Sequence, residues 1–169
     1  MPYEETLKII EELSKSLPHF PDGRINYTSS VLCPVISVFV KYKDRILLLK
    51  RSNKVGAYRG VWSTVAGYWD EPVSLKKKIL EELKEEIGLK EEQIKEIYFG
   101  ENFEVKDKRI NKNWLIHPVL VEVKEEPRIR LDFEHIALRW IRPLEINNFE
   151  VAPGLDKGLK NALEGEKYL

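Results

Sequence analysis

The chain has 169 residues, enough for one compact domain with its own core. Lysine plus arginine and aspartate plus glutamate each number 28, so no net charge attracts a nucleic acid polymer or an acidic membrane surface. No apolar run reaches the roughly 18–20 residues of a membrane span, and the N-terminus lacks the basic-then-apolar order of a signal peptide. We therefore expect a cytoplasmic protein that binds any polyanion at a local site.

Cysteine is nearly absent. Cys33 is the single cysteine, which excludes an internal disulfide and a cysteine metal cluster. Its place in VLCPVISVFV favours a buried apolar role over a reactive thiol. The many lysines and glutamates, with Gln93 as the single glutamine and no internal methionine, are typical of proteins from thermophiles.

The N-terminal residues predict an amphipathic helix. In YEETLKIIEELSKSL, Leu7, Ile10 and Leu13 recur near helical spacing, and Pro18 with the rest of HFPDG ends the pattern. We expect this helix to pack on the rest of the chain, the alternative being an arm that binds a partner. The interpretation is a single domain over residues 1–169, in which residues 1–30 are a helix and loop extension of a core over residues 31–169.

Strand patterns follow. VISVFVKY and RILLLKR are rich in β-branched residues and leucine, and Lys43 and Asp44 between them indicate a hairpin. Both runs are apolar on two faces, so the sheet should be covered on both sides. A loop with Gly56 and Gly60 then leads to VWSTVAGYW, expected to be another short strand.

The second half of the chain mixes helices and strands. Ser74 is a suitable N-cap for a helix over residues 75–87, and Gly88 is placed to end it. Strand candidates follow in IKEIYFGENFEV, NWLIHPVLVEV and HIALRWI, and a last helix is expected over much of residues 154–163. The predicted fold class is α/β (α+β), a mixed β-sheet with helices on both faces.

The helix over residues 75–87 carries acids beside its apolar stripe. At about 100° per residue, its core-facing leucines and isoleucines fall within an arc of about 140°. Glu86 lies inside this arc, and Glu82 lies just outside its edge with Glu85 on the same flank. Carboxylates three and four residues apart make one another harder to ionise where water is partly excluded. A hard cation such as Mg2+ or Mn2+, which takes oxygen ligands, would relieve this repulsion.

A solvated acidic face is the alternative for this helix. Lys77, Lys78 and Lys84 would then stabilise the glutamates through helix pairs such as Lys78 with Glu82. The helix by itself does not decide between the two interpretations.

The segment that contains this helix resembles the Nudix box. Residues 67–89 read GYWDEPVSLKKKILEELKEEIGL, and the family pattern is G-x5-E-x7-R-E-U-x-E-E-x-G-U, where U is a bulky aliphatic residue. The resemblance extends to Lys50 and Arg51, to GVWSTVAG and to EHIALRW, so it covers about residues 31–163 and implies a Nudix-type α/β/α sandwich. The matching box positions, from Gly67 to Leu89 without a gap, are Gly67, Glu82, Leu83, Glu85, Glu86, Gly88 and Leu89.

Two positions depart from the family pattern. Val73 stands where the family has its first glutamate, and Glu81 stands where it has an arginine that holds the other glutamates in position. Glu71 is a candidate to replace the missing glutamate. Lys78, one turn before Glu82, is a candidate to supply part of the arginine's charge.

The resemblance implies a hydrolase that cleaves a nucleoside diphosphate linked to another group by attack of water on phosphorus. Glu82, Glu85 and Glu86 would hold one or more Mg2+ or Mn2+ ions, with the carbonyl of Ala66 as a further ligand. Glu134 is the candidate general base, because RLDFEHIALRWI resembles the EH…RW segment of the family's diadenosine tetraphosphate hydrolases and dihydroneopterin triphosphate pyrophosphatases. The alternative for Glu134 is an ordinary exposed acid before a strand.

Candidates for substrate binding lie outside the box. Arg51 and Arg59 flank the loop that enters the site and suit phosphate, with Arg51 better placed and Arg59 equally interpretable as a surface charge. His135 either contacts the substrate or is structural. The candidates for stacking on a base, with core packing as the alternative, are Trp62, Trp69 and Trp114.

The substrate class stays open among nucleoside triphosphates, dinucleoside polyphosphates, nucleotide sugars and pterin triphosphates, and a homodimer is common in the family. One alternative is a non-catalytic Nudix-fold module that binds or senses a nucleotide, favoured by the Glu81 departure. Another is an enzyme like isopentenyl diphosphate isomerase, which requires a catalytic cysteine. Cys33, in a strand near the start of the chain, is poorly placed for that role.

Overall fold

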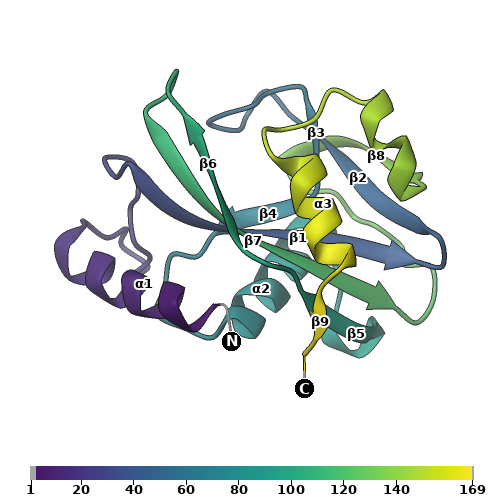
Figure 1. The fold of residues 1–169 in the computed structure, drawn as a ribbon, viewed down its shortest axis with the longest axis horizontal. Coiled ribbons are helices and arrows are strands. Elements are labelled where there is room, and N and C mark those ends of the chain that lie inside the picture. The colour runs from purple at the N-terminus through teal and green to yellow at the C-terminus, as the bar shows by residue number, and fades with distance from the viewer. Residues whose placement is uncertain (1–2, 169) are drawn as a thin grey trace.

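A mixed sheet forms the centre of the structure, a computed structural model that describes residues 3–168. Figure 1 shows helix α3 (Leu155–Leu163) in front of the sheet, and helix α2 (Leu75–Ile87) behind it. The expected mixed sheet with helices on both faces is therefore confirmed. Within the described residues, no helix combines the length and apolarity that a membrane span requires.

The remaining elements in chain order are α1 (Glu4–Ser16), β1 (Leu32–Tyr42), β2 (Arg45–Arg51), β3 (Trp62–Ser63), β4 (Val65–Tyr68), β5 (Ile94–Phe99), β6 (Phe103–Asp107), β7 (Lys112–Val123), β8 (His135–Ile141) and β9 (Glu166–Lys167). Short 3-10 helices cover Glu91–Gln93 and Pro143–Asn148.

The two longest strands organise the sheet. β1 and β7 run parallel in continuous register, from the Leu32–Asn113 pair to the Lys41–Glu122 pair, and the other strand pairs are antiparallel. Along the path β3-β2-β1-β7-β5-β9, three strands attach at the side: β4 to β1, β6 to β7 and β8 to β2. This topology brings β4, which leads into α2, and the start of β8 to the same region as the end of β2.

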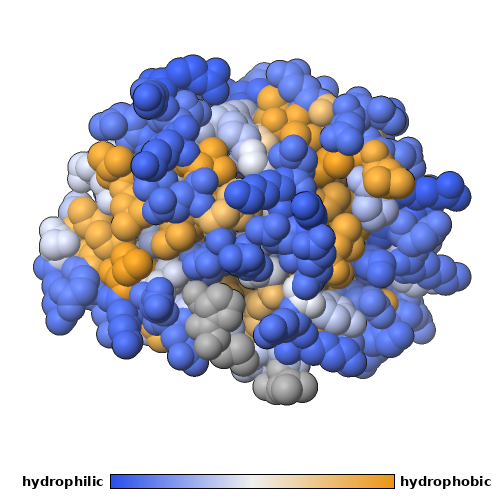
Figure 2. Space-filling model, in the orientation of Figure 1, coloured by the Kyte–Doolittle hydropathy of each residue, from blue (hydrophilic) through white to orange (hydrophobic). Residues whose placement is uncertain are grey.

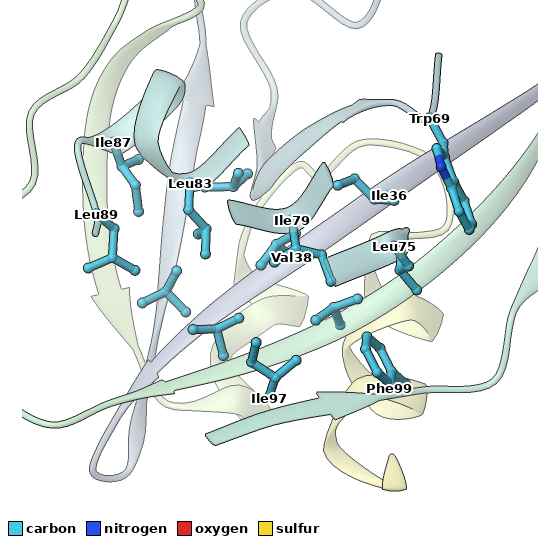
Figure 3. Close-up of a cluster of buried hydrophobic side chains, with 14 of the residues drawn as sticks. Ile36, Val38, Trp69, Leu75, Ile79, Leu83, Ile87, Leu89, Ile97 and Phe99 are labelled. Carbon is cyan, nitrogen blue, oxygen red and sulfur yellow. The ribbon is translucent and has the colours of Figure 1, made fainter. Parts of the chain in front are cut away.

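Alternation along the strands divides the core into two clusters. In β1, Ile36 and Val38 pack towards α1 and α2, whereas Phe39 packs towards α3. Leu47 and Leu48 of β2 divide in the same way. Figure 3 shows the cluster beneath α2, where the apolar side chains of the helix meet those of the sheet. Each fully buried side chain of this size contributes roughly 1.5–3 kcal/mol, so this packing fixes the orientation of α2.

Two expected single strands are each divided. VWSTVAGYW forms β3, which pairs with β2, and β4, which pairs with β1. Thr64 lies at the division, and its hydroxyl donates to the carbonyl of Val38 at 2.6 Å. IKEIYFGENFEV likewise forms β5 and β6, which pair with different parts of β7. A run of strand-forming residues does not reveal where its pairing partner changes.

The N-terminal extension packs on the sheet. Ile10 of α1 is fully buried in the cluster beneath α2, and Thr6 is hydrogen-bonded to His117 of β7 at 2.8 Å. The loop after α1 continues along the molecule, where the Ile25 N–H donates to the carbonyl of Asp70. The extension thus reaches the segment that precedes α2.

Candidate active site

Helix α2 has the predicted bounds because both ends are capped. The Ser74 hydroxyl accepts from the Lys77 N–H at 3.2 Å, and Gly88 adopts a left-handed conformation (φ 72°) that ends the helix. Ile79 and Leu83 are fully buried (Figure 3). The helix therefore cannot rotate to expose the acids that border its apolar stripe.

Glu82 is seated against a glycine. Gly67 lies in β4, and a Cβ atom at this position would lie 2.5 Å from the carboxyl carbon of Glu82. Any other residue would displace this carboxylate, because such contacts essentially never occur in proteins. The first glycine of the motif is thus explained by the space that Glu82 occupies.

Glu82, Glu86 and Glu134 form an acidic group in which Glu82 and Glu86 are buried and Glu134 is half-buried. Glu86 is 2% exposed; one oxygen accepts from the Ala66 N–H at 3.4 Å, and Oε2 has no hydrogen-bond partner within residues 3–168. Burial raises the pKa of Glu82 to about 7, and burial together with Glu82 and Glu134 raises that of Glu86 well above its ordinary value. Burial and the charge of Asp132 also raise the pKa of Glu134. The group therefore holds negative charge poorly when no cation is bound.

Lys78 is fully buried, so the alternative of a solvated lysine paired with Glu82 is wrong. Its ammonium lies 2.5 Å from Asp70, 3.1 Å from Glu71 and 3.2 Å from Glu81. Burial alone would lower the pKa of Lys78, but the hydrogen bond and charge of Asp70, with the bonds to Glu71 and Glu81, raise it. An internal cation therefore neutralises Glu81, the residue that departs from the family pattern, and Glu71 takes part in the same cluster.

Sequence reasoning missed Arg24, which lies in the loop after α1. Its guanidinium lies 3.3 Å from Oε1 of Glu85 and 3.5 Å from Glu71. Glu85 itself is half exposed. The pair joins residues 61 positions apart, and no motif covers the loop, so the sequence offered no signal for this contact.

His135, the first residue of β8, also belongs to the site. Its side chain is fully buried, with Nε2 3.9 Å from Glu86 and Nδ1 3.6 Å from Asp132. Burial, together with the charge of Arg51, lowers the pKa of His135 to about 4, so the imidazole is neutral near pH 7. One ligand atom each of Glu86, Glu134 and His135 lie within 4.8 Å of one another, an arrangement able to hold a metal ion.

A cavity of about 560 Å³ adjoins these carboxylates. Ala66, Gly67 and Glu134 line it on the side of the acids, and Arg51 is also in its wall. In Figure 2, hydrophobic and pale residues are visible between the β6–β7 hairpin and α3, within a mostly hydrophilic surface. The aromatic side chains in the wall are those of Phe39, Tyr58, Tyr68, Trp114 and Phe133.

Two of the predicted substrate-binding residues line this cavity. Arg51 donates from Nε and Nη2 to the carbonyl of Ala57, at 3.1 and 2.9 Å, and burial lowers the pKa of its guanidinium. Trp114 donates from its indole to the hydroxyl of Tyr58 at 2.9 Å, and Tyr58 donates to Asp107. Both side chains are therefore held in place by neighbours that line the same cavity.

The other candidates lie elsewhere. Arg59 is exposed and donates to the carbonyl of Val55. Trp62 packs edge-on against Phe149, and Trp69 is fully buried in the core. Cys33 is buried as expected, and burial raises the pKa of its thiol. These positions give no support to stacking by Trp69 or to nucleophilic chemistry by the cysteine.

The chain was compared with known proteins at three levels. A family model described as NUDIX domain matches residues 31–162. No curated protein gives a significant match. The matched segment contains the acidic group and His135, whereas α1 and Arg24 precede it.

Solved structures share the fold. The MutT protein from Methanosarcina mazei is 18% identical, with a TM-score of 0.64 over 79% of this chain and 94% of that chain. An Ap4A hydrolase from C. elegans is 17% identical, with a TM-score of 0.62 over 76% of this chain and 93% of that chain. A MutT NUDIX hydrolase from Burkholderia pseudomallei is 17% identical, with a TM-score of 0.63 over 77% and 97%.

Proposed function

Because the chain belongs to the Nudix family, whose hydrolases act on diphosphate bonds, we propose that it is a metal-dependent pyrophosphohydrolase of a nucleotide-like small molecule. The observation that carries this proposal is the acidic group of buried Glu82 and Glu86 with half-buried Glu134, of which Glu134 lines the cavity. Within residues 3–168, none of the three forms an ion pair with lysine or arginine. A bound cation is the partner that this arrangement lacks.

The residues present fit a divalent metal ion. Among the described residues, Oε2 of buried Glu86 has no hydrogen-bond partner, and Gly67 leaves room for the carboxylate of Glu82. Glu82, Glu85 and Glu86 would hold Mg2+ or Mn2+, both of which prefer oxygen ligands, and the carbonyl of Ala66 is the further ligand that the family resemblance implies. When bound, such an ion offsets phosphate charge and lowers the pKa of a bound water.

The chain itself supplies the other groups that the reaction needs. Glu134 borders both the acids and the cavity, and its raised pKa suits a group that accepts a proton from the attacking water. Arg51 presents a fixed positive charge to the phosphates from the cavity wall. Trp114 and Tyr68 provide aromatic surface for a planar group such as a base or pterin. The cavity volume falls in the usual range for small-molecule sites, about 300–1,000 Å³.

A phosphate-release screen tests the proposal. Purified protein is assayed with and without Mg2+ or Mn2+ on nucleoside triphosphates, dinucleoside polyphosphates, nucleotide sugars and pterin triphosphates. Glu86→Gln is the test variant, and Glu92→Gln, which removes an exposed acid from the 3-10 helix after α2, is the control. We expect metal-dependent turnover of at least one class, abolished in Glu86→Gln and kept in Glu92→Gln. Absence of turnover in both metals, with a nucleotide still raising the melting temperature, would replace the proposal with a binding module.

Glu134→Gln tests the assignment of the general base. Loss of the carboxylate should reduce kcat by roughly 10²–10⁴-fold and remove the acidic limb of the pH–rate profile. A loss below about tenfold, or an unchanged profile, would assign the proton transfer to another group.

A further inference from the structure

Both ring nitrogens of His135 lack a partner. The side chain is fully buried at the start of β8, and neither Nδ1 nor Nε2 forms a hydrogen bond within residues 3–168. Buried polar atoms are almost always hydrogen-bonded in native proteins, so each exception indicates a missing water or ligand. Oε2 of Glu86 is unpartnered in the same way and belongs to the same cluster.

The distances in this cluster suit a metal ion. Nε2 of His135 lies 3.9 Å from Oε1 of Glu86, and one oxygen of Glu134 lies within 4.8 Å of both ligand atoms. Donors bound to one ion at about 2.0–2.2 Å are roughly 3–4 Å apart. Separations of up to 4.8 Å would have to contract by about 1–2 Å to place all three donors around one ion.

The carboxylate of Asp132 lies beside the other ring nitrogen of His135, just beyond hydrogen-bond distance. Its Oδ1 lies 3.6 Å from Nδ1 of His135 and also accepts the backbone N–H of Glu134 at 3.0 Å. Metal-binding histidines usually present their second nitrogen to a carboxylate, which fixes the tautomer and leaves the first nitrogen free for the metal. Asp132 stands in that position, and its own position is fixed by the turn before β8.

We propose that Glu86, Glu134 and His135 form a mixed nitrogen and oxygen site that binds Co2+, Zn2+ or Mn2+ more tightly than Mg2+. Imidazole suits Zn2+ and Co2+ best, Mn2+ prefers oxygen but as a transition ion also accepts an imidazole nitrogen, and Mg2+ favours oxygen ligands alone. One oxygen of Glu134 completes the site, and the other stays available to accept a proton. The inference rests on the proposed function, because Glu86 belongs to both.

Pulsed electron paramagnetic resonance of Mn2+ bound to the full chain tests the nitrogen ligand directly. We expect modulation from an imidazole nitrogen in the unaltered protein, its loss in His135→Gln, and its persistence in His19→Gln, which removes an exposed histidine. Calorimetry should show Co2+ binding weakened by at least about tenfold in His135→Gln, with Mg2+ binding changed by less than about threefold.

The outcomes separate this inference from the proposed function. Mn2+ bound without nitrogen modulation would overturn the inference and assign the unpartnered nitrogens to a buried water, while the hydrolase proposal would stand. Absence of Mn2+ and Co2+ binding while Mg2+ still binds would overturn the inference alone, and absence of binding by all three ions would overturn both. The decisive spectrum is that of the unaltered chain, so the test does not depend on the folding of His135→Gln, and His135→Asn provides a second variant.

Discussion

Two acidic clusters at helix α2 differ in the presence of an internal cation and in burial, because Glu71 and Glu81 are partly exposed whereas Glu82 and Glu86 are buried. On one flank, Asp70, Glu71 and Glu81 surround the ammonium of Lys78 at 2.5–3.2 Å. On the other flank, Glu82 and Glu86 lie together at the edge of the apolar stripe. Within residues 3–168, neither forms an ion pair with lysine or arginine. The first cluster contains its own cation, whereas the carboxylates of the second cluster are available to bind one.

The difference explains why the departures at Val73 and Glu81 do not remove the acidic site. Glu81 would add repulsion to an acidic helix if it faced Glu82, but its carboxylate is bound to Lys78 at 3.2 Å. Where the family pattern has an arginine, this chain has Glu81, and the buried Lys78 three positions earlier carries the positive charge. The Glu81 departure therefore no longer favours a non-catalytic module.

Removal of Lys78 should have the largest effect on stability. Lys78→Met leaves three acids around a buried apolar side chain, and loss of one partner from a buried ion cluster costs about 3–5 kcal/mol. Urea unfolding with EDTA measures this loss, and Lys77→Met, at an exposed position of the same helix, should stay within about 0.5 kcal/mol. A loss below about 1 kcal/mol for Lys78→Met would mean that the first cluster is solvated and that the two flanks do not differ.

The metal-free protein should lose stability as the pH rises through the range of the second cluster. Glu82, with its pKa raised to about 7, and Glu86 keep protons in the folded state that the unfolded chain releases near pH 4.5. Folding therefore takes up protons between about pH 4.5 and pH 7. The free energy of unfolding should fall over this range as the pH rises, by on the order of 3 kcal/mol. Mg2+ or Mn2+ should reverse the loss.

Urea unfolding from pH 5 to 8 measures this dependence. His117 and His135, whose pKa values burial lowers to about 4, contribute the opposite slope below pH 6.5. The pH dependence of stability that is due to Glu82 and Glu86 is therefore the slope of unfolding free energy against pH in the unaltered chain minus that slope in Glu82→Gln/Glu86→Gln. Equal slopes in the two proteins would contradict a strained acidic group.

The sequence predicts the parts of this site that depend on local signals. The bounds of α2 follow from Ser74 and Gly88, and the arc of its leucines and isoleucines places Glu86 in the buried stripe. The division of β3 from β4 does not follow, because both halves have strand-forming residues and differ only in their partner strands. Tertiary pairing decides such boundaries.

The contacts that complete the site lie beyond local patterns. Lys78 is buried because the turn with Asp70 and Glu71 folds over it, and a helix wheel contains no information about that turn. His135 meets Glu86 because the turn before β8 is bonded to α2, where the Asp132 N–H donates to the carbonyl of Glu86 at 3.3 Å. Helical and strand periodicity reveal neither contact, although the residue types on each side can be read from the sequence.

Gly67→Ala should have an intermediate effect, limited to the second cluster. The added Cβ would lie 2.5 Å from the carboxyl carbon of Glu82, and overpacking of this kind costs about 1–3 kcal/mol. Mn2+ affinity should fall together with stability because Glu82 is displaced. In a Glu82→Ala background the same substitution should be close to neutral for stability, and an unchanged penalty in that double-mutant cycle would show that the strain lies elsewhere.

The smallest effect is expected at Arg24, which forms an ion pair with Glu85. Arg24 and Glu85 are both partly exposed, so Arg24→Gln should change stability by less than about 1 kcal/mol. The charge of Arg24 competes with a metal ion for Glu85, however. Its removal should tighten Mn2+ binding by a few-fold at low salt, and this gain should shrink at higher ionic strength because salt screens the charge. Arg24→Lys, which keeps the charge, should bind Mn2+ as the unaltered chain does. If Arg24→Gln weakens Mn2+ binding instead, the N-terminal extension holds Glu85 in its binding position, and a cation at this border supports the metal site rather than opposing it.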